Sequence, residues 1–446
     1  MLFHEKLPDT RYVGNWQWIP KKLIPEEQIV KDLTFAPENQ KDEVAIRIFR
    51  ESKLHYLCPK YYDVRTELKT IDMTPQFPDF YFDDRITSFL DDAQEATWKI
   101  FENASHGILH VSCGRGKTVL ACKKIAHEHK QTLIVVPTTG LLSQWEAEIR
   151  DKLGYQKEIG RIQANRFDWD KPIVIATIHT LALHAYEWPE AFKRRYGIVI
   201  YDEVHETAPR IFQRASSLFW GRRFGLTATK DRDDGLQGVY LNHIGQVFLS
   251  DTTQPVKPLI FFKLLPTMVN LSMRYLKDMT GQLSIARLWT YLGKMDERNI
   301  VIRNETLQAL KENRKILILS YSKPHLSILK HMLEECGVKK IELLTGDTPQ
   351  GNRTGILRNS DVTLGTMGVA KRGLDAPMLD TVFFVSPFKS SIAMVQGIGR
   401  TLRYCEGKNK PVIVIFEDYK VRPAKGLCDS LKVKLNIMEW KFQIIG

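Results

Sequence analysis

Short apolar runs alternate with helix-length amphipathic stretches between Phe89 and Ser250. The runs themselves contain almost no polar positions, unlike a strand with one face in water. Such strands, separated by helices, are typical of a parallel sheet covered on both faces. The pattern therefore predicts an α/β lobe, with strands over 108–111, 133–136, 173–176, 198–201 and 224–226.

A second alternation of the same kind begins at Lys315. It predicts another parallel sheet, with strands over 316–319, 341–344, 362–364, 382–385 and 412–416. The fold class is therefore α/β, with two parallel-sheet lobes in tandem.

The segments outside the two lobes have different patterns. Seven prolines interrupt residues 1–84, and alternation at Val44, Ile46 and Ile48 predicts a small N-terminal α+β domain. Residues 251–310 open with a proline-punctuated linker and then favour helices over 284–312. The predicted organisation is an accessory domain over 1–84, a first lobe over 85–250, connecting helices over 251–310 and a second lobe over 311–446.

The net charge of the chain indicates what kind of partner the protein binds. The 446 residues include 64 Lys and Arg against 52 Asp and Glu, a net charge of +12. An excess of cations favours a polyanionic partner such as nucleic acid, although a basic enzyme without such a partner fits the charge too. Residues 1–84 mix aromatic and basic side chains, which suits either contacts to nucleic acid or the core of a small domain.

The cysteine pattern and the N-terminal sequence indicate the cellular compartment of the protein. Six scattered cysteines form no CxxC pair and no zinc-like spacing with histidine, so we expect reduced thiols and no structural metal. The chain shows no secretory signal pattern and no apolar run of membrane-spanning length. We expect a cytoplasmic monomer, in the host cytoplasm if the protein is viral.

A loop suited to phosphate lies between the first predicted strand and the next helix. Residues 107–118 read GILHVSCGRGKT, with Val111 where the usual P-loop has its first glycine. Backbone N–H groups of Cys113, Gly114, Arg115 and Gly116, with the helix N-terminus behind them, would face phosphate oxygens. Lys117 would reach the β and γ phosphates of a nucleotide, and the Thr118 hydroxyl would hold Mg²⁺.

A carboxylate pair follows the fourth strand of the first lobe. Asp202 and Glu203 open the sequence DEVH at a strand end, where ligands of parallel sheets bind. Asp202 would bind Mg²⁺ through water, and Glu203 would orient and deprotonate the attacking water. A carboxylate pair alone would more simply cap a helix, so the interpretation rests on its combination with the phosphate loop.

The second lobe has no glycine-rich phosphate loop after its first strand. It does contain QGIGRTLR, in which Arg400 and Arg403 are three residues apart and share a helical face. Such arginines could neutralise transition-state charge, or they could simply be solvated on a surface helix.

Taken in order, these motifs resemble those of superfamily 2 helicases of the DExH kind, which have two RecA-like lobes. Residues 386–403, SPFKSSIAMVQGIGRTLR, are most similar in style to phage branch-migration helicases of the UvsW type. The resemblance covers about residues 90–420 and implies ATP and Mg²⁺ as cofactors and DNA, branched or duplex, as partner.

The resemblance also implies roles for single residues. Gln94 would read adenine, and Gly373 and Asp375 would lie near the ribose. His205, Thr227 and Thr229 would couple the nucleotide to the rest of the motor. The resemblance adds Gln396 to the catalytic set with Arg400 and Arg403 on the γ phosphate, and assigns DNA contacts to Pro137, Thr138, Thr177, Ser320, Thr345 and Thr366.

The expected function is therefore ATP-dependent remodelling of branched DNA, including fork regression and Holliday-junction branch migration in recombination, replication or repair. An RNA-directed or single-strand-unwinding DExH helicase is the nearest alternative. A nucleic-acid clamp that binds ATP without hydrolysing it is an alternative of another class, and the intact Glu203, Arg400 and Arg403 argue against it. A restriction-type translocase subunit is a further possibility, although no separate nuclease motif stands out.

Overall fold

The computed structural model forms two compact units, residues 1–253 and 254–446. It describes residues 9–37, 44–65, 67–82, 92–112, 115–207, 209–229, 232, 234–251, 258–370, 378–386, 388, 407–437 and 440–446. No described helix is both long enough and apolar enough to cross a membrane.

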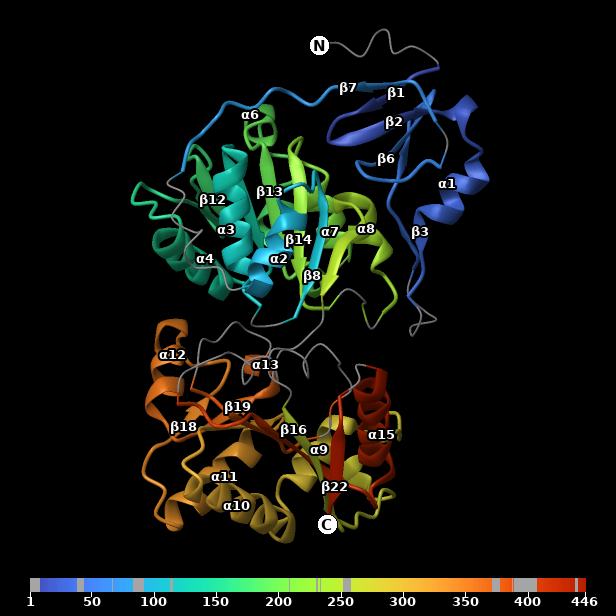
Figure 1. Cartoon of the computed structure of the whole chain (residues 1–446). Helices are drawn as coiled ribbons and strands as arrows, with labels where there is room; N and C mark the ends of the chain where they lie inside the picture. Colours follow the sequence, from blue (N-terminus) through green and yellow to red (C-terminus); the bar gives the residue numbers. More distant parts are fainter. Residues whose placement is uncertain are drawn as a thin grey trace. The chain divides into compact units, whose positions relative to one another are not determined.

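An eight-stranded sheet forms the centre of the first unit (Figure 1). Its order is β11-β10-β12-β9-β13-β14-β8-β15, and β11 pairs antiparallel while the other described pairs are parallel. All five predicted strands are confirmed, whereas β10, β11 and β15 were not anticipated. The bounds are β8 (Gly107–Val111), β9 (Thr132–Val136), β10 (Gly160–Gln163), β11 (Arg166–Phe167), β12 (Ile173–Thr177), β13 (Ile198–Asp202), β14 (Arg222–Thr227) and β15 (Val247–Asp251).

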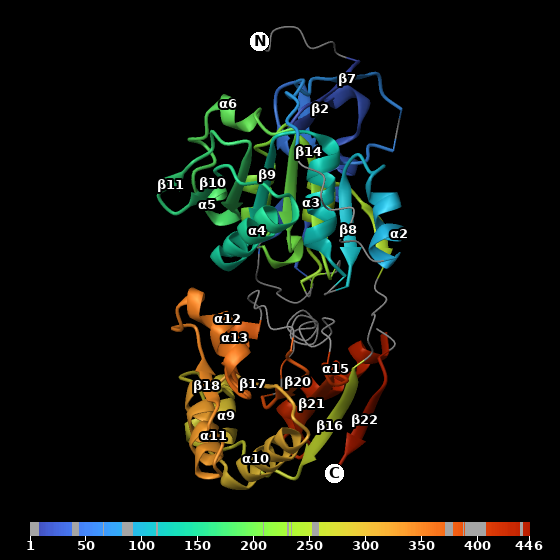
Figure 2. The ribbon, with the colours of Figure 1, turned by 60° about the vertical axis from the view of Figure 1, so that its left-hand side comes forward.

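Helices cover both faces of this sheet because successive strand residues point to opposite sides. Leu109 and Val111 of β8 belong to one buried cluster with α3 and α4, whereas Ile108 belongs to another with α5 and α7. Figure 2 shows α3 and α4 side by side on one face. The helices of the lobe are α2 (Asp92–Phe101), α3 (Lys117–Glu128), α4 (Thr139–Lys152), α5 (Ile178–Leu183), α6 (Glu190–Lys193), η3 (Val204–Glu206), α7 (Pro209–Ser216) and α8 (Gly238–Ile244).

The N-terminal residues form a smaller sheet in the order β5-β6-β2-β1-β7. Trp16 and Trp18 are buried within it, so these aromatic side chains pack inside the domain. The alternation predicted at Val44, Ile46 and Ile48 contains β4, and a similar alternation of Leu54, Tyr56 and Cys58 overlaps β6, while β1 and β2 had no clear signal. The elements are β1 (Arg11–Val13), β2 (Trp16–Pro20), η1 (Lys21–Leu23), α1 (Glu26–Asp32), β3 (Thr34–Phe35), β4 (Ile46–Arg47), β5 (Arg50–Glu51), β6 (His55–Pro59) and β7 (Thr70–Asp72).

This N-terminal sheet is bonded into the first lobe. The buried Lys60 donates to the backbone oxygens of Trp220 and Gly221, and the buried Arg223 donates to that of Asn15 at 2.9 Å. Leu236 lies just before α8 and Val239 lies in its first turn. Both belong to the same apolar cluster as residues of α1 and β6. Removing the N-terminal residues would therefore expose apolar surface and leave Arg223 short of an acceptor.

The second unit contains a seven-stranded sheet in the order β18-β19-β17-β20-β21-β16-β22, with every described pair parallel. The five predicted strands are confirmed. Its elements are β16 (Leu259–Leu265), η4 (Arg274–Leu276), α9 (Ile285–Leu292), α10 (Asp296–Lys311), β17 (Ile316–Ser320), α11 (Lys323–Glu335), β18 (Ile341–Leu344), α12 (Gln350–Asn359), β19 (Val362–Thr366), α13 (Met367–Ala370), β20 (Thr381–Phe384), β21 (Val412–Asp418), α15 (Arg422–Ile437) and β22 (Phe442–Ile445).

One stretch of the second unit differs from its prediction. Residues 251–310 were expected to hold only a linker and helices, but β16 lies there and pairs with β21 over seven residues. Ile260 and Phe262 are buried against α15, which explains why this apolar run belongs to the sheet. The helices predicted over 284–312 are present as α9 and α10.

Candidate functional site

The described part of the phosphate loop has the geometry that a nucleotide site requires. Gly116 caps α3 with φ +75°, a left-handed conformation that glycine adopts readily. A Cβ there would lie 2.1 Å from Nε2 of Gln94, so a larger residue would displace the Gln94 side chain. Gln94 itself donates to the Arg115 carbonyl oxygen at 3.4 Å, which places the predicted adenine reader against the loop.

Contacts with neighbouring strands hold the loop in place. Nζ of Lys117 lies 3.5 Å from the carbonyl oxygen of Val111, and Arg115 forms a 3.7 Å ion pair with Asp251 at the end of β15. The buried His110 of β8 bonds to Ser250 Oγ at 2.8 Å and to the Ala228 carbonyl oxygen at 3.2 Å. His110 was not predicted to matter, because a lone histidine in an apolar strand has no distinctive sequence signal.

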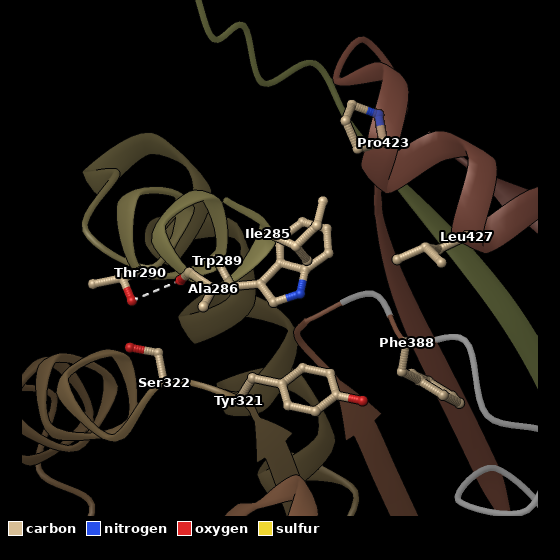
Figure 3. Close-up of a pocket in the computed structure, with 9 residues that line it drawn as sticks. All are labelled: Ile285, Ala286, Trp289, Thr290, Tyr321, Ser322, Phe388, Pro423 and Leu427. Atoms are coloured by element: carbon tan, nitrogen blue, oxygen red, sulfur yellow. Dashed lines mark hydrogen bonds between the residues drawn. The ribbon is translucent and has the colours of Figure 1, made fainter. Parts of the chain in front are cut away.

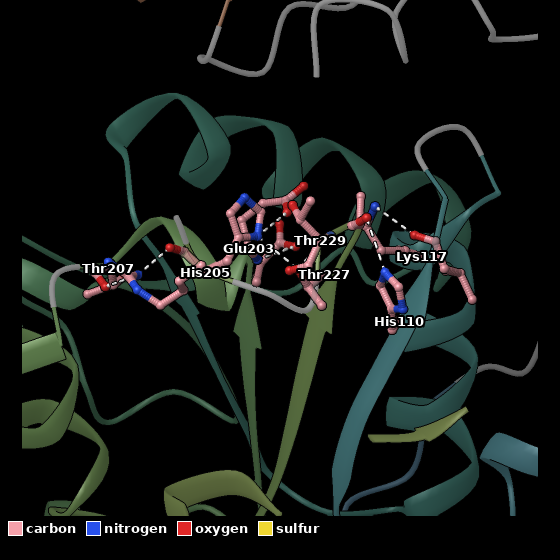
Figure 4. Close-up of polar contacts among 11 residues, drawn as sticks. His110, Lys117, Glu203, His205, Thr207, Thr227 and Thr229 are labelled. Carbon is pink, nitrogen blue, oxygen red and sulfur yellow. Dashed lines mark hydrogen bonds and ion pairs between the residues drawn. The ribbon is translucent and has the colours of Figure 1, made fainter. Parts of the chain in front are cut away.

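Asp202 is the last residue of β13. Glu203, which follows it, lies at the same edge of the sheet as Lys117 (Figure 4). Oδ1 of Asp202 accepts from the Glu203 amide at 3.0 Å, and Oδ2 of Asp202 accepts from the Trp145 indole at 2.8 Å. Burial and the neighbouring Glu203 raise the pKa of Asp202 to about 7, while the indole hydrogen bond acts in the opposite direction. The role of Trp145 as a donor to Asp202 became visible only in the structure.

Glu203 has the backbone strain that often accompanies function. Its φ is +45°, in a region that residues other than glycine rarely occupy. Oε2 of Glu203 is buried without a hydrogen-bond partner among the described residues and lies 3.5 Å from Nδ1 of His205. A buried carboxylate oxygen in this position is suited to accept a proton from a bound molecule.

His205 connects β13 to the end of β14. Its Nδ1 lies 2.7 Å from Thr227 Oγ1, and the Thr227 hydroxyl donates to the Thr229 carbonyl oxygen at 2.6 Å (Figure 4). Because the hydroxyl hydrogen is used in this way, we infer that Nδ1 of His205 donates the proton it shares with Thr227. Arg232 adds bonds to the backbone oxygens of His205 and Thr207, and so fixes the same turn.

The residues predicted to face DNA have varied surroundings in the first unit. Pro137 and Thr138 are half-buried at the start of α4. Thr177 is buried, and its hydroxyl pairs with that of Thr180 at 2.8 Å.

The corresponding residues of the second unit also differ among themselves. Thr345 and Thr366 are half-buried. Ser320 is fully buried and bonds to His325 at 3.1 Å and to Ser386 at 3.0 Å. The Ser320 hydroxyl therefore faces the interior and bonds within the turn after β17, and its contact with DNA stays a prediction. The neighbouring Tyr321, which had not been predicted, is 47% exposed instead.

Several predicted site residues lie outside the described residues. They are Cys113, Gly114, Gly373, Asp375, Gln396, Arg400 and Arg403. Their roles stay predictions from the motifs.

Two family models match the chain. The model described as type III restriction enzyme, res subunit, matches residues 85–232, and the helicase conserved C-terminal domain matches residues 298–405. Together with the relatives described next, these two matches support a superfamily 2 helicase. The first match holds the phosphate loop and the Asp202–Glu203 pair, and the second holds most of the strands of the second sheet.

Relatives named as helicases or translocases extend over much of the chain. "Putative ATP-dependent RNA helicase L396" of Acanthamoeba polyphaga mimivirus is 26% identical over 90% of this chain and 80% of its own length. The "DNA 3'-5' translocase XPB2" of Sulfurisphaera tokodaii is 28% identical over 75% of this chain and 76% of its own length. The solved structure of S. cerevisiae Dbp5 bound to RNA and ADP BeF3 covers 79% of this chain and 89% of that chain, with a TM-score of 0.56 and 16% identity.

These likenesses confirm the expected fold class, an α/β protein with RecA-like parallel-sheet lobes. They also support an ATP-driven enzyme that acts on nucleic acid. Among the described residues, no group of three or more His, Cys, Asp or Glu side chains is arranged to hold a metal ion by itself. A cation at Asp202 would therefore need other ligands, such as phosphate oxygens, which is how Mg²⁺ is usually held with a nucleotide.

Proposed function

We propose that this helicase is an ATP-dependent DNA motor that remodels branched DNA, including regression of forks and branch migration of Holliday junctions. The observation that carries the proposal is the similarity over three quarters of the chain to a protein named a DNA translocase. The net charge of +12 fits a duplex or branched polyanion as the track. The likeness of residues 386–403 to UvsW-type enzymes supports branched DNA over other duplex substrates.

The nucleotide reaction is assigned to the edge of the first sheet. Lys117 and the amides of the phosphate loop would bind phosphate oxygens, while Thr118 and Asp202 would hold Mg²⁺, which neutralises charge on the phosphates when bound. Glu203 would orient the attacking water and take its proton, since its Oε2 is buried and lacks a hydrogen-bond donor among the described residues. Gln94 would contact the base because it lies against the loop.

Coupling of hydrolysis to movement is assigned to the bonds among His205, Thr227 and Thr229. A change at Glu203 reaches the end of β14 through only two side chains. Hydroxyls and backbone amides at strand ends would contact the sugar-phosphate backbone, so movement requires no reading of sequence.

The N-terminal domain is proposed to add contacts to DNA. Its aromatic side chains are mostly buried, but Arg47, Arg50, Lys53 and Arg65 are exposed. Exposed cations suit phosphate contacts better than base stacking.

An RNA-directed helicase is the second candidate, because the mimivirus relative bears that name. An ATPase titration with purified protein separates the two candidates. Single-stranded, duplex, forked and four-way DNA are compared with RNA at one stated salt concentration. Strongest stimulation by forked or four-way DNA, together with branch migration, supports our proposal. Stronger stimulation by RNA would favour the alternative, and the absence of any turnover would favour a non-hydrolysing clamp.

A further inference from the structure

A hollow of about 600 Å³ lies within the second unit, outside the nucleotide motifs. Figure 3 shows its lining side chains, which come from α9, the turn after β17, the segment after β20 and α15. Three aromatic rings border it, those of Trp289, Tyr321 and Phe388. Pro423 and Leu427 of α15 complete the lining.

Buried hydrogen bonds fix the turn that places Tyr321 in the hollow. Ser320 bonds to His325 and Ser386, and His325 bonds in turn to Asn299 at 2.9 Å. The Tyr321 amide donates to Ser386 Oγ at 3.3 Å. These bonds hold the backbone at Tyr321 in place, while Tyr321, which lines the hollow, is 47% exposed.

The position of the hollow within the sheet favours a ligand. β17 lies between β19 and β20, and the chain continues from β17 to β18 and β19 on one side and then to β20 and β21 on the other. The carboxyl ends of β17 and β20 thus flank the switch point of this parallel sheet. Ligands of open α/β sheets bind outside the carboxyl ends at such a point.

The charges next to the lining residues favour a polyanion. Arg287, Lys323, Arg422 and Lys425 each lie within two residues of a lining residue, and all four are exposed. Two of these cations already have acidic partners, since Lys323 pairs with Asp347 at 2.5 Å and Lys425 pairs with Asp429 at 3.4 Å. Among the described residues, Arg287 and Arg422 form no ion pair, so the surroundings keep a net positive charge. Apolar and aromatic walls beneath a cationic rim suit a base with its phosphates outside, since bases stack on aromatic rings while cations hold the backbone.

We propose that this hollow takes one unstacked base of a single nucleic-acid strand, with the neighbouring phosphates on the cationic rim. The inference rests on the proposed function, because a branched substrate presents separated strands. An apolar side chain of a partner protein would also fit the walls, but it would gain nothing from the cations around them.

The test uses the full-length chain and a labelled single-stranded DNA in which one abasic position is moved along the oligonucleotide. We expect the abasic position to weaken binding about 5- to 150-fold at one register, the range expected for loss of one stacked base. Tyr321→Ala should weaken binding of the intact strand and abolish the dependence on abasic position, whereas Tyr321→Phe should keep both. Tyr275→Ala, at a half-exposed tyrosine of the same unit that does not line the hollow, is the control and should behave as wild type.

Two results would overturn the inference. One is a flat abasic scan with the wild-type chain, which needs no variant to fold. The other is an abasic dependence that persists in Tyr321→Ala. ATPase stimulation by four-way DNA is measured on the same wild-type preparation, so a flat scan with preserved stimulation rejects the base site alone. Loss of all stimulation by nucleic acid would reject the proposed function as well.

Discussion

The indole Nε1 of Trp145 donates a 2.8 Å hydrogen bond to Oδ2 of Asp202, and both side chains are buried. Trp145 lies on α4 and Asp202 ends β13, so the bond links the helix after one strand to the carboxylate of the neighbouring strand. It fixes one oxygen of Asp202 and leaves the other near the Glu203 amide. The carboxylate is thereby oriented before any nucleotide binds.

Trp145→Phe should lower ATPase activity by roughly tenfold to a hundredfold. A hydrogen bond to a charged group contributes about 1.5–3 kcal/mol, and the buried carboxylate would lose its donor. Steady-state ATPase and the affinity for the magnesium nucleotide are the measurements. Trp188→Phe is a matched control, since buried Trp188 donates to the Leu181 carbonyl oxygen at 3.1 Å in the same lobe. Equal losses in the two variants would mean that the effect is one of packing alone.

Glu203→Gln should keep nucleotide binding and reduce turnover by about 10² to 10⁴, the usual contribution of a general base. The amide has the shape of the carboxylate but cannot take a proton from water. Binding of a fluorescent nucleotide and single-turnover hydrolysis separate the two effects. Unchanged turnover would mean that another group takes the proton.

Thr227→Val should reduce stimulation of ATPase by nucleic acid more than basal turnover. The valine keeps the shape but removes the oxygen that bonds to His205 and to the Thr229 amide. Thr306→Val is the control, because the buried Thr306 hydroxyl donates within α10, to the Ile302 carbonyl oxygen at 2.8 Å. A normal ratio of stimulated to basal activity in Thr227→Val would exclude this route of coupling.

Removing residues 1–84 should lower solubility and basal ATPase together. The truncated chain would lose the Asn15 oxygen bonded to Arg223 and uncover Leu236 and Val239. Light scattering, the thermal midpoint and basal ATPase of residues 85–446 are the measurements. A soluble fragment with full basal activity and weaker DNA binding would instead define a separable accessory domain.

Lys60 gives the N-terminal interface a specific pH dependence. Burial, aided by Arg223, lowers the pKa of Lys60 to about 7, far below that of an unfolded lysine. Between pH 7 and about 10.4 the unfolded state binds more protons, so this group makes stability rise with pH, by at most about 1.4 kcal/mol per unit. Below pH 7 both states are protonated, and its contribution no longer changes.

Lys60→Met removes this titration while keeping a long side chain. Thermal midpoints from pH 7 to 9 should therefore rise less steeply, or fall more steeply, in the variant than in wild type. Losing the bonds to Trp220 and Gly221 shifts the thermal midpoint of the variant at every pH. The test is therefore the difference between the slopes of the thermal midpoint against pH in the variant and in wild type. Parallel curves would show that Lys60 keeps an ordinary pKa in the fold.

Much of the fold could be predicted because each buried parallel strand is a short, continuous run of apolar residues in the sequence. The ten predicted strands are all present, since each run is bounded by polar turn residues. β16 was missed because a proline-rich stretch precedes it, and β1 and β2 because their mixed pattern gives no clear period. Short edge strands such as β11 depend on their neighbours for pairing rather than on their own sequence.

By itself the sequence determined the two-lobe α/β plan, the phosphate loop with Lys117, and the Asp202–Glu203 pair, because each is specified by adjacent residues. Only the tertiary structure decided that Trp145 holds Asp202, that Ser320 turns inward while Tyr321 turns outward, and that Lys60 lies buried under the N-terminal sheet. The bonds of Trp145 and Lys60 join residues 57 and 160 positions apart. The orientations of Ser320 and Tyr321 depend on the residues that pack against the turn after β17. A local sequence pattern does not predict such contacts, because they are set by packing among segments that are distant in the sequence.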